Sequence, residues 1–129
     1  MDASALVKRY VEEAGSDLVR QVMDAADAWF ICRIAFVEVI RAVGITAGHA
    51  AARAVREEWG AFGVVEVDQA LVERAAELAL TRDLRSLDAL HLAAALTLPP
   101  DDLVLATWDR RLHEAAREEG LSVTPEALT

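Results

Sequence analysis

A chain of 129 residues with 54% hydrophobic residues is long enough to bury the core of one domain and too short to divide into two. Its formal net charge of −9 argues against broad attraction to nucleic acid, unless several carboxylates converge on one site that binds divalent cations. Since there is no long apolar run and a single cysteine, Cys32, we expect no membrane span, no secretory leader and no intrachain disulfide, and place the protein in the cytoplasm.

In the first half of the chain, stretches with helical periodicity alternate with short apolar runs. The expected elements are a helix over Ala5–Val11 capped by Ser4, a helix capped by Ser16, a strand over Trp29–Cys32, a helix over Ala35–Val43 ending near Gly44, a helix over Ala47–Trp59 and a strand over Val64–Val67.

The second half continues the alternation. We expect a helix over Leu71–Leu80 capped by Asp68, a helix over Leu87–Leu98 capped by Ser86, a strand over Leu103–Ala106, a helix that starts at Asp109 and ends at Gly120, and an extended tail at Leu121–Val123. Apolar strands separated by helices indicate a parallel sheet covered on both faces, and such sheets bind ligands beyond the carboxyl ends of their strands.

Four acidic residues fall where this architecture could bring them together. Asp109 follows a strand, Asp88 lies in the first turn of an apolar helix, Glu38 lies within an apolar helix, and Asp2 precedes a helix start. Carboxylates that converge must take up protons or bind a hard cation, and oxygen ligands suit Mg²⁺ or Mn²⁺. Taken singly, the three aspartates could instead cap helices, and Glu38 could be exposed.

Two further side chains have the chemistry of a site. Cys32 lies in an apolar stretch and is expected to be a buried packing residue rather than a nucleophile. His91 lies three residues after Asp88, so a role as metal ligand or base is conceivable, but packing with one hydrogen bond is the simpler expectation.

Four stretches, taken in chain order, carry a resemblance to a known family. They are Asp2-Ala3-Ser4-Ala5-Leu6-Val7-Lys8, Phe36-Val37-Glu38-Val39, Leu87-Asp88-Ala89-Leu90-His91-Leu92-Ala93-Ala94-Ala95 and Ala106-Thr107-Trp108-Asp109-Arg110-Arg111-Leu112. Together they resemble the conserved blocks of PIN domains of the VapC toxin group, over nearly the whole chain.

The resemblance implies a fold, an activity and a set of site residues. The fold is a single PIN-like domain over residues 1–129, a three-layer α/β/α arrangement with a central, mainly parallel sheet whose first strand is missing or very short. The activity is that of a Mg²⁺- or Mn²⁺-dependent endoribonuclease, the toxin of a toxin–antitoxin pair. Asp2, Glu38, Asp88 and Asp109 match the acidic quartet, with Ser4 and Thr107 orienting its carboxylates.

The resemblance also implies partners. These are an RNA substrate, a cognate antitoxin whose C-terminal segment blocks the acidic pocket, and a second copy of the chain in a homodimer. Arg85, Arg110 and Arg111 lie close enough in sequence to steady the RNA backbone, although a solvated surface role is the alternative for each. Members of the family carry a few apolar residues before the first aspartate, whereas only Met1 precedes Asp2, so either the start of the chain is placed late, or the sequence is trimmed, or Asp2 is held less firmly than in the family.

Two other functions are weighed against this one. A phosphoryl-transfer fold with an aspartyl nucleophile would have Asp-x-Asp after its first strand or a late lysine, whereas Ser4 follows Asp2 at that spacing and Lys8 is the only lysine. The second alternative is a catalytically impaired PIN-like scaffold that acts as a protein-binding module. The intact quartet of acids favours the nuclease over this scaffold.

Overall fold

The computed structural model describes residues 1–128. Two hydrophobic cores lie on opposite sides of the strands. Adjacent residues of strand β1 (Trp29–Cys32) show this directly, because Ile31 packs into one core and Cys32 into the other. Side chains of a strand point alternately to its two faces, so a strand covered on both faces is apolar throughout. Cys32 is 1% exposed, which confirms its expected packing role.

Helices make up most of the chain, and the strands are short. The helices are α1 (Ala3–Tyr10), α2 (Ser16–Ala25), α3 (Ala35–Ala47), α4 (His49–Glu58), a 3₁₀ turn at Trp59–Ala61, α5 (Gln69–Thr81), α6 (Ser86–Leu96) and α7 (Arg110–Glu118). The strands are β1, β2 (Phe62–Val65), β3 (Val104–Ala106) and β4 (Ser122–Thr124). Over residues 1–128, no helix has the length and apolar character needed to cross a bilayer.

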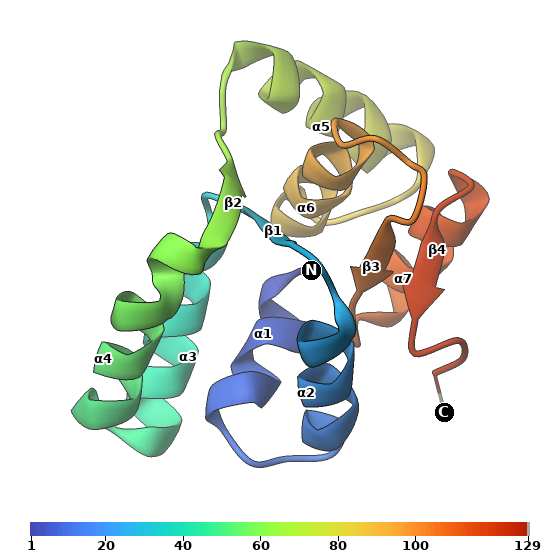
Figure 1. Ribbon diagram of the computed structural model, residues 1–129. Coiled ribbons are helices and arrows are strands. Elements are labelled where there is room, and N and C mark those ends of the chain that lie inside the picture. Colours follow the sequence, from blue (N-terminus) through green and yellow to red (C-terminus); the bar gives the residue numbers. More distant parts are fainter. Residues whose placement is uncertain (129) are drawn as a thin grey trace.

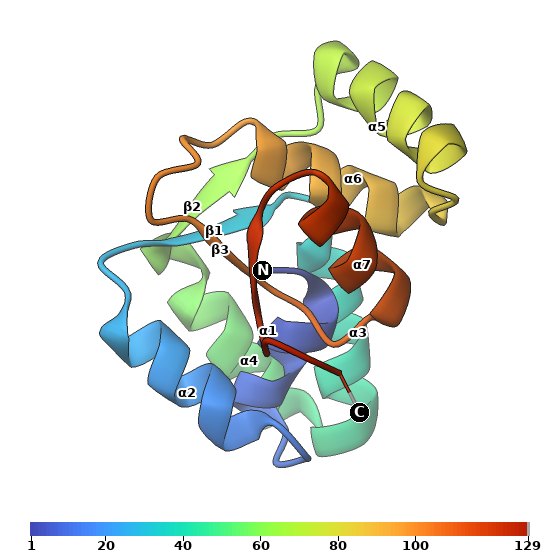
Figure 2. The same ribbon diagram turned by 90° about the vertical axis from the view of Figure 1, so that its right-hand side faces the viewer.

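The helices divide into two groups around the strands (Figure 1). Helices α1 to α4 share one core with Ile31 and Phe62, and helices α5 to α7 share the other with Cys32 and Leu105. Figure 2 shows α5 lying over α6 at the outer edge of the second group. This arrangement of helices around parallel strands confirms the expected α/β fold class.

The strands pair in parallel, but they form two separate pairs. Strand β1 pairs with β2 in the register Trp29↔Phe62, and β3 pairs with β4 in the register Val104↔Ser122. The first two residues of the chain link the pairs, because the Met1 nitrogen donates to the Phe30 carbonyl at 3.1 Å and Asp2 N–H donates to the Ala106 carbonyl at 3.2 Å. Beside this link, a mainly apolar cavity of about 770 Å³ opens between β1 and β3.

Several expected boundaries are wrong, for local reasons. Asp2, not Ser4, caps α1, because its carboxylate accepts from Ala5 N–H. Helix α3 continues through Gly44 to Ala47 and ends at Gly48, whose φ of +90° leaves the helical region, whereas Gly44 keeps helical backbone.

Other boundaries agree with expectation or shift slightly. The strand over Trp29–Cys32 is confirmed, and so is the cap of α5, where the Asp68 carboxylate accepts from Leu71 N–H at 2.9 Å. Ser86 is the first residue of α6 rather than its cap, a place that Arg85 takes without a side-chain cap bond.

At position 15, just before α2, both the backbone conformation and the space beside the residue require glycine. Its φ is +93°, and a Cβ there would lie 2.8 Å from the Trp108 ring, whereas Gly120, with φ +86°, faces open space. We expect Gly15→Ala to lower the free energy of unfolding by about 2–4 kcal/mol, from left-handed strain plus overpacking, and Gly120→Ala by about 1 kcal/mol, from strain alone. Urea denaturation of both variants measures this, and equal losses would contradict the contact with Trp108.

Candidate active site

The carboxylate of Asp2 is buried and is held from both sides. Its Oδ1 accepts from the Ser4 hydroxyl at 2.8 Å and from Ala5 N–H at 3.1 Å, and its Oδ2 accepts from the Thr107 hydroxyl at 2.7 Å. Asp2 is 3% exposed. The N-terminal end of α1 also favours negative charge. Although it lies next to the chain start, Asp2 is therefore fixed by three donors.

Two hydroxyl groups join Asp2 to the segment that follows β3. Thr107, which is fully buried, donates to Asp2 and accepts from Asp109 N–H at 3.1 Å. Ser4 likewise donates to Asp2 and accepts from Trp108 N–H at 3.0 Å. Both hydroxyl residues named from the sequence thus contact the carboxylate that they were expected to orient.

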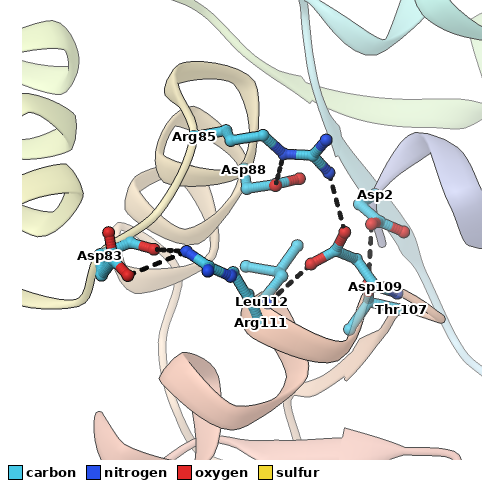
Figure 3. Close-up of polar contacts among 8 residues, drawn as sticks. All are labelled: Asp2, Asp83, Arg85, Asp88, Thr107, Asp109, Arg111 and Leu112. Carbon is cyan, nitrogen blue, oxygen red and sulfur yellow. Dashed lines mark hydrogen bonds and ion pairs between the residues drawn. The ribbon is translucent and has the colours of Figure 1, made fainter.

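Asp88 and Asp109 face each other across one arginine (Figure 3). The Oδ1 atom of Asp109 caps α7 by accepting from Leu112 N–H at 2.9 Å, and its Oδ2 accepts from Arg85 Nη2 at 3.2 Å. The Oδ2 atom of Asp88 accepts from Arg85 Nε at 3.3 Å. Burial raises the pKa of Asp88, the charges of Asp109 and Asp2 raise it further, and Arg85 opposes them. Arg85 thus contacts both Asp88 and Asp109, and Thr107 contacts both Asp109 and Asp2, so the three connected aspartates are called the acidic cluster (Figure 3).

Glu38, the fourth expected acid, bonds to a histidine instead. Its Oε1 lies 2.8 Å from Nε2 of His91, whose side chain is 2% exposed. His91 lies one turn after Asp88 on α6, so α6 presents Asp88 to the cluster and His91 to Glu38. The Nδ1 atom of His91 is buried without a hydrogen-bond partner. The sequence suggested one hydrogen bond for His91, but gave no sign that its partner would be Glu38.

The three arginines named from the sequence have different surroundings. Arg85 contacts the acidic cluster, as described above. Arg111 turns to Asp83, donating to its carboxylate at 2.9 Å and to its carbonyl at 3.0 Å. Arg110, the first residue of α7, is exposed next to Asp109 in the chain.

The cluster has the chemistry of a cation site. Its side chains offer carboxylate oxygens, the ligands that hard divalent cations prefer, and the pKa of Asp88 is raised by burial and by the charge of Asp109, which Arg85 only partly offsets. As these side chains stand, no three His, Cys, Asp or Glu residues within residues 1–128 are grouped to hold one ion. By their chemistry, the residues of the cluster fit a divalent cation.

Comparisons with known proteins agree with the sequence blocks. The family model described as PIN domain matches residues 1–118. The chain is 38% identical, over 136 aligned residues, to Ribonuclease VapC45 of Mycobacterium tuberculosis (strain CDC 1551 / Oshkosh) and to Ribonuclease VapC49 of strain ATCC 25618 / H37Rv, covering 98% of this chain and 94% of each relative. It is 35% identical to Ribonuclease VapC46 of the latter strain over 123 residues, covering 95% of this chain and 93% of the relative.

The hydroxyl of Thr107 should matter more than its methyl group. Thr107→Val keeps the shape but leaves a buried Asp2 oxygen without its donor, so we expect a loss of about 2–3 kcal/mol in the free energy of unfolding. Thr107→Ser keeps the hydroxyl and should lose about 1 kcal/mol. Chemical denaturation of both variants tests this, and a Ser variant as unstable as the Val variant would contradict it.

The raised pKa of Asp88 also predicts a pH dependence. Between its ordinary value of 3.8 and the higher folded value, the native chain binds more protons than the unfolded chain, so this group lowers stability as pH rises through that window. In metal-free buffer, Asp88→Asn should therefore be more stable than wild type at pH 7, with the advantage shrinking towards pH 4. Thermal denaturation across this range measures it, and a less stable variant at pH 7 would refute it.

Proposed function

Since the chain belongs to the PIN-domain family, in the group whose relatives are named VapC, we propose that it is a metal-dependent endoribonuclease and the toxin of a toxin–antitoxin pair. The observation that carries the proposal is that Asp2, Asp88 and Asp109, from three distant segments of the chain, are connected through Thr107 and Arg85 in one cluster. The relatives described above, all named as ribonucleases, support the same activity.

In this proposal, the acidic cluster holds Mg²⁺ or Mn²⁺. Asp2, Asp88 and Asp109 would be its ligands, with Glu38 as the fourth acid of the site. When bound, such a cation would activate water and stabilise the negative charge that develops during phosphodiester hydrolysis. A site made of carboxylates also suits a protein with a net charge of −9, because bound cations offset the repulsion between the acids and the RNA.

The remaining residues of the site have positioning roles. Ser4 and Thr107 hold the Asp2 carboxylate in one orientation, which fixes the direction of its free lone pairs. His91 holds the Glu38 carboxylate in the same way. Arg85, Arg110 and Arg111 are proposed contacts to the RNA backbone, and all three are exposed.

The partners follow from the same assignment. We propose a cognate antitoxin that covers the acidic site, a homodimer of this chain, and action on RNA in the cytoplasm. The alternative, a catalytically impaired scaffold that only binds a partner protein, requires a site that does not cleave RNA even when saturated with metal.

The experiment is incubation of the purified protein with total RNA, with Mn²⁺ or with EDTA. We expect fragments that appear with Mn²⁺ and disappear with EDTA, because the acidic cluster cannot activate water without the cation. Asp88→Asn should reduce cleavage roughly 100-fold or more, since it removes a ligand oxygen and a charge.

Asp83→Asn is the matched control. Asp83 pairs with Arg111 beside the cluster, its side chain is 90% exposed, and its φ of 52° suits asparagine. This variant should cleave RNA as the wild type does. Intact RNA at saturating Mn²⁺, with a folded wild-type protein, would reject the nuclease and favour the scaffold.

A further inference from the structure

The acidic cluster contains its own cation, the guanidinium of Arg85. We propose that Arg85 is a displaceable internal counter-ion, which bridges Asp88 and Asp109 when no divalent cation is bound and leaves when one binds. The inference rests on the proposed function, because it concerns the affinity of the same site for metal. It assigns to Arg85 a control over metal binding that is separate from any contact with RNA.

The position of the guanidinium carries the inference. Arg85 donates to Oδ2 of Asp88 and to Oδ2 of Asp109, and in Figure 3 it lies between the two carboxylates. The other oxygen of Asp109 is already committed to the cap of α7. Arg85 thus holds the Asp109 oxygen that the fold leaves available, and a cation bound by these two aspartates would need the same place.

The contacts of Arg85 with Asp88 and Asp109 are suited to being broken and re-formed. The two distances, 3.3 and 3.2 Å, lie at the long end of the hydrogen-bond range, and the Arg85 side chain is 78% exposed. The carboxylates beneath it are only 14% and 22% exposed. When an exposed arginine covers two less accessible acids, each contact contributes little free energy, because solvent screens the attraction between the charges.

Other arginines of the chain show what a structural ion pair looks like here. Arg9 and Arg82 are 20% and 28% exposed, and each has a contact of 2.6 Å to a glutamate, Glu58 and Glu118 respectively. Arg85 is both more exposed and more loosely bound than either. It is therefore suited to exchange, whereas Arg9 and Arg82 are suited to holding elements together.

The backbone of Arg85 can stay in place while the side chain moves. Arg85 is the residue before α6, and its carbonyl accepts from Ala89 N–H at 2.9 Å, which anchors the start of the helix. Its side chain is not needed for that bond. Release of the guanidinium would leave α6, and with it Asp88, where they are.

The test is calorimetric titration with Mn²⁺ alone, without RNA. If Arg85 competes with the metal, Arg85→Gln should bind Mn²⁺ roughly three- to tenfold more tightly than wild type. In EDTA, the same variant should melt at a lower temperature than wild type, because Asp88 and Asp109 then repel without a counter-ion. Added Mn²⁺ should raise its melting temperature by more than it raises that of the wild type.

Arg20→Gln is the matched control. Arg20, on α2, also bridges two carboxylates, those of Glu12 and Asp17, and neither of these belongs to the acidic cluster. The variant loses the same charge, so its Mn²⁺ affinity should stay at the wild-type value. A gain in Arg20→Gln equal to that in Arg85→Gln would reduce the effect to net charge and overturn the inference.

Two further outcomes separate this inference from the proposed function. In the first outcome, Arg85→Gln binds Mn²⁺ no more tightly than wild type, and Asp88→Asn binds none. This result would support the metal site and contradict the proposed role of Arg85. If none of these proteins binds Mn²⁺ while all remain folded, both the metal-dependent function and the inference fail.

Discussion

The site depends on one buried carboxylate, that of Asp2. A charge with 3% exposure is stable only when donors surround it, and the donors come from α1 and from the segment after β3. The backbone of Asp2 strengthens this junction by donating to Ala106. Because Thr107 binds Asp2 and Asp109 at once, the same junction sets the start of α7 and the direction of its capping acid.

The three aspartates of the acidic cluster differ in the hydrogen-bond donors and charges that surround them. Asp2 has three neutral donors, whereas Asp88 and Asp109 share one exposed guanidinium. Evenly paired carboxylates would stabilise the fold more, but they would have little affinity for a cation from solution. In the proposed nuclease, this uneven pairing would let a chain with a net charge of −9 act on a polyanionic substrate, since the relevant quantity is the local charge once a cation is bound.

Much of this was predictable from the sequence, and what was not depended on tertiary contacts. The strand at Trp29–Cys32 and the caps Asp68 and Asp109 follow from local chemistry, and the structure has them. The end of α3 was missed because two glycines lie close together in the sequence, and the one with the left-handed φ that ends the helix is Gly48 rather than Gly44. The bond between His91 and Glu38 joins residues 53 positions apart, and the contact of Arg85 with Asp109 joins residues 24 apart, distances at which periodicity carries no information.

The link that Met1 and Asp2 form between the two strand pairs has a practical consequence. Met1 lines the cavity between β1 and β3 and its nitrogen donates to the Phe30 carbonyl, so any residues joined to its amino side, such as a purification tag, would start at that cavity, one residue before Asp2 of the acidic cluster. Glu126 and Ala127, near the other terminus, are exposed. Recombinant versions carrying the handle at the carboxyl end are therefore the appropriate material for metal-binding measurements.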